Sequence, residues 1–213
     1  MTTPSFLYRA LPEEAYARRF VHDGVVWLSN IHRYRTIVDA KRHDPDEGTA
    51  RYLEPMEGRP GTGSDDLIMN TRRIFNPVLV LCVSEPSIEP EVLVTFGSHV
   101  IRINDPDALC RDLRNYFRSG PHETRGSVEL CKVAYSESEP VDPSLDGRGR
   151  HRLTYAQKAI RYRAECEWRI VLIVETLHRV PGVIAKLGRR LEYCELLPNY
   201  CVNPSAGDRP PAG

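Results

Sequence analysis

Residues 164–175 read AECEWRIVLIVE, and this stretch predicts more about the fold than any other part of the chain. Every second residue from 166 to 174 is apolar, which is typical of a strand that packs one face on a core. The opposite face begins with Glu165, Glu167 and Arg169. Two carboxylates at this spacing on one strand face lie about 7 Å apart. We therefore expect a strand whose charged entrance can act on one small molecule.

Apolar runs and helix signals surround this strand. Further strands are predicted at residues 6–10, 25–29, 78–84, 92–96, 99–103, 127–135 and 190–196. Helices are predicted at residues 12–22, 106–120 and 154–163, the last from a capping box of Thr154 and Gln157. Residues 30–76 lack a strong period and include a Gly-rich loop at 58–66. The order of elements predicts an α+β fold with about three helices.

The length of 213 residues suits one domain with a substantial core. We expect residues 1–202 to form a single α+β domain. Residues 136–152 are predicted to be a polar connector within it. Residues 203–213 are rich in Pro and Gly, and a disordered tail is predicted there.

Composition excludes several classes of protein. Basic and acidic residues number 29 each, so the net charge is zero and no global field attracts nucleic acid. The six cysteines form no CxxC pair and the histidines form no HxxxH pair, so no metal is expected. No leader pattern and no apolar run of membrane length occur, which predicts a cytoplasmic protein that does not enter a membrane. Phosphate-loop and nucleophile-elbow motifs are also missing.

Two parts of the chain together resemble the ADP-ribosyltransferase-like fold. The first is the opening strand Leu7-Tyr8-Arg9, followed by a helix, Gly24 and the strand at 25–29. The second is Glu165-Cys166-Glu167, a Glu-x-Glu motif on a late strand. The resemblance implies a mostly antiparallel, split β-sheet core and implies NAD as the substrate.

The chain also resembles a widespread bacterial family of uncharacterised proteins. The shared features are Tyr8-Arg9, the Cys82-Val83-Ser84 strand end, the turn at 44–48 and the segment at 158–169, which reads KAIRYRAECEWR. This resemblance covers residues 6–175. For a bacterial protein, the transferase resemblance implies an enzyme that acts as a toxin or a phage-defence effector.

The transferase resemblance implies a role for each of three charged residues. Glu167 stabilises the ribosyl cation that forms when nicotinamide leaves, and Glu165 positions or deprotonates the acceptor. Arg9 binds the pyrophosphate or the nicotinamide ribose. A fourth charged residue, Arg169, shares the predicted strand face with both glutamates and is expected to contact a phosphate or to hold the carboxylates in place. The acceptor is left open among protein, nucleic acid and small molecule, and no oligomeric state is specified.

The remaining candidates are polar and aromatic pocket residues. Related transferases often carry Ser-Thr-Ser on the pocket strand, which this chain lacks, so Ser29 and Ser84 are both candidates. Tyr34 or Tyr162 is expected to stack on nicotinamide or adenine. The short join before the Glu-x-Glu strand leaves little room for a loop that presents the acceptor.

Alternative interpretations of the same residues stay open at this point. On one alternative, Glu165, Glu167 and Arg169 form a surface ion-pair ladder on an edge strand. On another, the segment is helical and Glu165 and Arg169 form an i,i+4 pair. Lys158 is expected on an exposed helix face, and Trp27 and Trp168 in the core. Functionally, the alternatives are a non-catalytic nucleotide- or partner-binding module and, less favoured, a nuclease.

Overall fold

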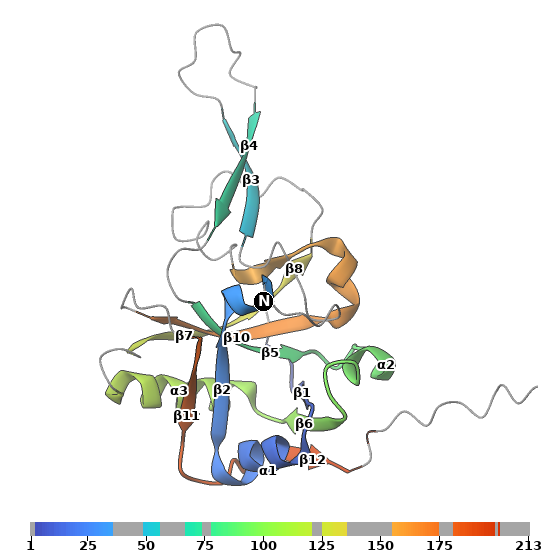
Figure 1. Cartoon of the computed structure of the whole chain (residues 1–213), viewed down its shortest axis with the longest axis vertical. Helices are drawn as coiled ribbons and strands as arrows, with labels where there is room; N and C mark the ends of the chain where they lie inside the picture. Colours follow the sequence, from blue (N-terminus) through green and yellow to red (C-terminus); the bar gives the residue numbers. More distant parts are fainter. Residues whose placement is uncertain are drawn as a thin grey trace, which may run out of the picture.

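The computed structural model describes residues 3–35, 49–55, 67–73, 78–120, 125–135, 155–174, 181–198 and 200 (Figure 1). The fold is α+β with a mostly antiparallel sheet and few helices, as predicted. Its elements in chain order are β1 (Leu7–Leu11), α1 (Glu14–Asp23), β2 (Val25–Asn30), η1 (Ile31–Arg35), β3 (Thr49–Pro55), β4 (Leu67–Arg73), β5 (Val78–Ser84), α2 (Pro90–Leu93), β6 (His99–Ile103), α3 (Pro106–Ser119), β7 (Gly126–Lys132), β8 (Ala134–Tyr135), β9 (Gln157–Lys158), η3 (Ile160–Glu165), β10 (Glu167–Val174), β11 (Gly182–Lys186) and β12 (Cys194–Leu197).

Strand β5 organises the eight-stranded sheet. The order is β11-β2-β5-β1-β6-β12, with β10 paired to β5 and to β7. Because β10 follows β5 along its whole length, from Glu167 opposite Ser84 to Ile173 opposite Val78, β1 and β2 must share the other edge of β5. Strand β1 pairs with the Ser84 end, and β2 pairs with Leu79 and Val80. The sheet is therefore split between β1 and β2.

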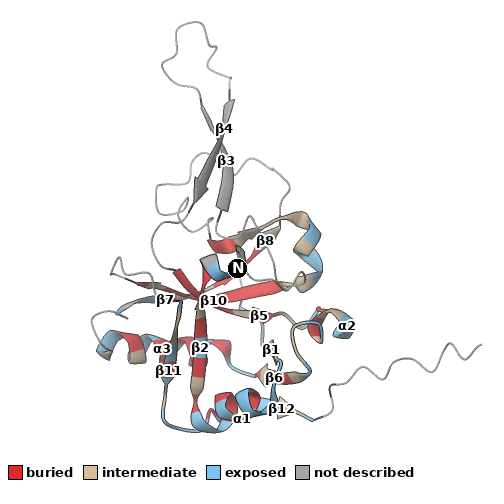
Figure 2. Ribbon diagram, in the orientation of Figure 1, coloured by how far each residue is buried: buried red, intermediate tan, exposed pale blue. Residues whose placement is uncertain are grey.

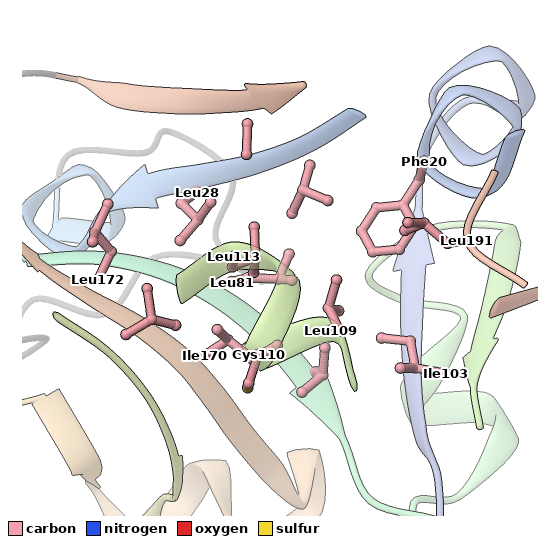
Figure 3. Close-up of a cluster of buried hydrophobic side chains, with 14 of the residues drawn as sticks. Phe20, Leu28, Leu81, Ile103, Leu109, Cys110, Leu113, Ile170, Leu172 and Leu191 are labelled. Atoms are coloured by element: carbon pink, nitrogen blue, oxygen red, sulfur yellow. The ribbon is translucent and has the colours of Figure 1, made fainter. Parts of the chain in front are cut away.

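The core packs where α1 and α3 cover the sheet (Figure 3). Helix α3 presents Leu109, Leu113 and Phe117 to the core, and all three are fully buried. Both faces of β10 are covered, since Trp168, Ile170 and Leu172 join this cluster while Val171 packs in a second one. Figure 2 shows β10 buried along its length. A strand between two neighbours and two packed faces holds its polar residues in fixed positions.

Local chemistry explains where the helices stop and start. Helix α1 ends at Gly24, whose φ of 62° lies in the left-handed region and where a Cβ would meet the Arg189 carbonyl oxygen at 2.7 Å. Helix α3 begins after Asp105, whose Oδ1 accepts a hydrogen bond of 2.8 Å from the Ala108 backbone N–H. Both boundaries follow from signals in the sequence.

Several predicted elements are wrong. Residues 92–96 are not a strand, because they belong to the short helix α2 and to the turns that follow it. Their backbone N–H groups donate to carbonyls three or four residues earlier in the chain, those of residues 89, 90, 92 and 93. The helix predicted at 154–163 is replaced by the short strand β9 and the 3₁₀ helix η3. Strands β3, β4 and β11 were not predicted. The predictions at 44–48, 58–66, 136–152 and 203–213 lie outside the described residues.

None of the helices within the described ranges has both the length and the apolar character needed to cross a bilayer.

Candidate functional site

Glu167 opens β10 as a buried carboxylate. Its side chain is 5% exposed, and its backbone N–H donates to the Tyr135 hydroxyl at 2.7 Å. Arg169 donates to both carboxylate oxygens, from Nε to Oε1 at 2.8 Å and from the second terminal nitrogen to Oε2 at 3.2 Å. Arg169 is itself 1% exposed and donates to the Tyr155 carbonyl at 2.8 Å. The pair is buried, so the interpretation as a surface ion-pair ladder is wrong.

Glu165 does not lie on the strand, which corrects the prediction that it shares a strand face with Glu167. It is the last residue of η3, and Cys166 follows in the left-handed conformation with φ 45° and ψ 46°. This turn breaks the period of two before β10 begins. The i,i+4 helix alternative is wrong as well, because Arg169 belongs to the strand.

Lys158 joins the two carboxylates. Its Nζ lies 2.6 Å from Glu165 Oε2 and 3.1 Å from Glu167 Oε2, so the two acids approach the same ammonium group. The Lys158 side chain is 10% exposed and comes from β9, not from an exposed helix face as predicted. The sequence signal was present, since Lys158 opens the segment that ends in the Glu-x-Glu motif.

The two carboxylates differ in acidity. Burial raises the pKa of Glu165 to about 7, although the nearby Lys158 charge acts in the opposite direction. Burial also acts to raise the pKa of Glu167, but the Arg169 and Lys158 charges outweigh it and hold that pKa below its usual range. At neutral pH the site therefore holds one fully ionised carboxylate and one that exchanges a proton.

A small cavity of about 110 Å³ lies beside this pair. Six of the eight predicted site residues line it: Arg9, Tyr34, Ser84, Tyr162, Glu165 and Glu167. Strand pairing explains why residues so distant in sequence meet, because Tyr8, Ser84 and Glu167 lie opposite one another on β1, β5 and β10. Arg9 follows Tyr8 and so sits at the same end of the sheet.

The structure separates the two serine candidates. Ser84 ends β5 directly opposite Glu167, is 7% exposed and lines the small cavity. Ser29 lies on β2, accepts a hydrogen bond of 2.8 Å from Trp27 Nε1 and lines a second cavity instead. Ser84 is therefore the serine that shares a cavity with the carboxylates.

Arg169 lies behind Glu167. It donates to the Glu167 carboxylate and to the Tyr155 carbonyl, and it is not among the residues that line the small cavity. Of the two roles considered for it, this geometry suits holding the carboxylate in place.

Arg9, on β1, is held by a hydrogen bond to the neighbouring strand β5. A terminal guanidinium nitrogen donates to the Cys82 carbonyl at 2.6 Å. Its Nε is buried and has no hydrogen-bond partner among the described residues. A buried donor of this kind is normally satisfied, so an anionic oxygen in the cavity would complete its bonding.

Cys82, Tyr135 and Tyr155 belong to the site surroundings that sequence reasoning missed. The Cys82 thiol donates to the Tyr34 hydroxyl at 3.6 Å, and burial raises its pKa to about 12, so it stays a neutral thiol. No spacing marked Tyr135 or Tyr155, because both reach the site from other elements. In the described ranges no three His, Cys, Asp or Glu side chains gather as they would around a metal ion.

Comparisons with protein-family models, with curated proteins and with solved structures gave no match for this chain.

Proposed function

We propose that the chain cleaves the bond between nicotinamide and ribose in NAD and transfers ADP-ribose to an acceptor. One observation carries the proposal: an ionised Glu167 and a less acidic Glu165 line one cavity together with Arg9. Two carboxylates of different acidity are the usual equipment for glycosidic bond chemistry.

The bond-breaking step needs a fixed negative charge beside the ribose, and it needs no general acid because nicotinamide leaves as a neutral molecule. When the C1′–N bond breaks, its electron pair goes to the pyridinium nitrogen, and nicotinamide leaves as a neutral molecule. The ribose is left with positive charge, which a preorganised carboxylate stabilises. Glu167 suits this role because it is ionised and because Arg169 holds both of its oxygens in one orientation.

The bond-forming step needs a base. The acceptor attacks C1′ and gives up a proton, and a group with a pKa near the working pH takes that proton most effectively. Glu165 has such a pKa, and its link to Lys158 keeps it close to Glu167. After transfer, Glu165 carries the proton and the acceptor carries ADP-ribose. With water as the acceptor the outcome is NAD hydrolysis.

Arg9 supplies the site with an anion-binding group. Its buried Nε lacks a partner among the described residues, and a pyrophosphate oxygen would satisfy it. Arg9 lines the small cavity of about 110 Å³, so a pyrophosphate that borders this cavity would meet its guanidinium group.

The test is release of nicotinamide from NAD by the purified chain. Glu167→Gln is expected to lower the rate about 100-fold or more, because it removes the charge that stabilises the ribosyl cation. Glu192→Gln is the matched control, since Glu192 is 77% exposed and lies outside the cavity, and it should leave the rate unchanged. An inactive wild type across protein, nucleic-acid and water acceptors, or a fully active Glu167→Gln variant, would refute the proposal.

A second candidate is a non-catalytic nucleotide- or partner-binding module. It is favoured by the contacts of Glu167, whose Oε1 accepts from Arg169 and whose Oε2 is shared by Arg169 and Lys158. A carboxylate with both oxygens engaged has little capacity left for a ribose hydroxyl. On this alternative the chain binds NAD without consuming it, and Glu167→Gln keeps its function in cells.

A further inference from the structure

A second, larger cavity lies at the split of the sheet. It measures about 480 Å³ and is lined by residues of β1, α1, β2, η1, β5 and β11. This volume falls in the range of pockets that hold a small organic ligand. The two cavities share Arg9, Leu11 and Tyr34, so these three side chains form the boundary between them.

Exposed apolar side chains gather at this cavity. The large apolar residues that are exposed in the described part of the chain are Tyr16, Trp27 and Ile184, at 48%, 40% and 38%, and all three line it. An exposed apolar patch confined to one cavity marks a binding surface. Two of the three side chains are aromatic and offer flat faces to a planar ring.

The Trp27 ring is held in place before any ligand arrives. Its Nε1 donates to Ser29 Oγ at 2.8 Å, which fixes the ring from one side. On the neighbouring strand β11, a Cβ at Gly182 would lie 3.0 Å from the indole, so the ring rests against a residue that has no side chain. The exposed indole is thus a preorganised stacking surface.

The charge of this cavity is positive. Arg9, Arg19 and Arg33 line it, and no aspartate or glutamate occurs among its described lining residues. Planar guanidinium groups beside aromatic faces suit a ligand that combines a flat ring with a phosphate. The buried Nε of Arg9 again provides a donor that lacks a partner among the described residues.

We propose that this cavity binds a nucleoside 5′-phosphate. The base stacks on Trp27 beside Tyr16, and the phosphate is bound by Arg19, Arg33 and Arg9. The proposal rests on the proposed function only for the source of the nucleotide, which is either the adenylate half of NAD or a nucleotide of the acceptor. Binding itself does not require the carboxylates to be catalytic.

The test is fluorescence anisotropy of 1,N6-etheno-AMP titrated with the full chain. Trp27→Ala, Arg19→Gln and Arg33→Gln are each expected to weaken binding about tenfold, through loss of stacking or of a charged hydrogen bond. Trp27→Phe should keep most of the affinity because it retains a ring. Arg18→Gln is the matched control, since Arg18 is the neighbour of Arg19 on α1, is 61% exposed and pairs with Glu14 outside the cavity.

Competition distinguishes the two sources. Displacement of the probe by NAD as effectively as by AMP assigns the cavity to the adenylate half. Displacement by an oligothymidylate but not by NAD assigns it to a nucleotide of the acceptor. Both results support the proposal.

Loss of NAD cleavage and loss of nucleotide binding are separable. Glu167→Gln should bind etheno-AMP as the wild type does, so an inactive chain that still binds the probe refutes the proposed function and leaves the cavity assigned. The absence of saturable binding at about 1 mM protein would overturn the inference. So would wild-type affinity in the Trp27→Ala, Arg19→Gln and Arg33→Gln variants alike.

Discussion

Cys166 determines how the two carboxylates meet. Among the described non-glycine residues it is the one with a positive φ, at 45°, and it separates Glu165 from Glu167. Its carbonyl accepts a hydrogen bond of 2.9 Å from the Glu85 backbone N–H, which ties the turn to the end of β5. An extended residue at this position would carry Glu165 along the strand, away from Lys158.

The first prediction concerns this turn. Cys166→Gly should have an unfolding free energy within about 1 kcal/mol of the wild type, because glycine adopts the left-handed conformation without strain. Cys166→Val should lose about 2 kcal/mol, since a β-branched residue tolerates that conformation poorly. Urea denaturation measures both. Equal stability of the two variants would contradict the strain assigned to Cys166.

The second prediction concerns the pH dependence of stability. The pKa of Glu165 is about 7 in the folded chain, above its value of about 4.5 in the unfolded chain. Between these two pH values the folded chain keeps a proton on Glu165 that the unfolded chain has released. Stability should therefore fall by about 1–3 kcal/mol as pH rises through that window. Glu167 has the opposite sign, because its lowered pKa stabilises the fold above pH 4.5 and this contribution is lost in acid.

Glu165→Gln isolates the first of these effects. The variant has no proton to lose, so its unfolding free energy should stay level between pH 5 and 7 where that of the wild type declines. Glu192→Gln, at an exposed position, should decline like the wild type. Parallel curves for Glu165→Gln and the wild type would show that Glu165 does not titrate in this range.

At the scale of elements, capping residues in the sequence predicted the boundaries of helices correctly where neighbouring residues alone determine them. The helices predicted at 12–22 and 106–120 are present as α1 and α3, because Gly24 ends the first and Asp105 caps the second, and capping depends on a few adjacent residues. The helix at 154–163 was wrong although Thr154 and Gln157 fit a capping box. There the pairing of β9 with β8 and the contacts of Lys158 override local propensity.

The third prediction tests the α3 cap. Asp105→Ala should lower the unfolding free energy by about 1 kcal/mol, because the Ala108 N–H loses its acceptor. Asp107→Ala is the control in the same turn. It removes an exposed acidic residue and should cost only a few tenths of a kcal/mol through the helix dipole. Chemical denaturation of both variants measures the difference, and equal losses would argue against a specific role for the cap.

At the scale of the whole molecule, the period-two pattern of β10 predicted a core strand but not what flanks it. The apolar face of Trp168 and Ile170 was predicted correctly, whereas Trp27, predicted for the core, is 40% exposed at the larger cavity. Arg9, Ser84 and Glu167 meet because β5 pairs with both β1 and β10, whereas Tyr34 reaches the cavity from η1, and Tyr162 and Glu165 reach it from η3. Such pairings join distant residues, and a single sequence carries no local signal for them.

The position of β5 between β1 and β10 also has a consequence for synthesis of the chain. Arg9 comes from the first strand, whereas Glu167 comes from a strand translated more than a hundred residues later. Strand β5 can pair with β10 only after β10 has left the ribosome. Contacts between residues so far apart in sequence also form slowly. A nascent chain therefore carries the arginine and no carboxylate pair. The chemistry that we propose is withheld from the cell until nearly all of the sheet has been made.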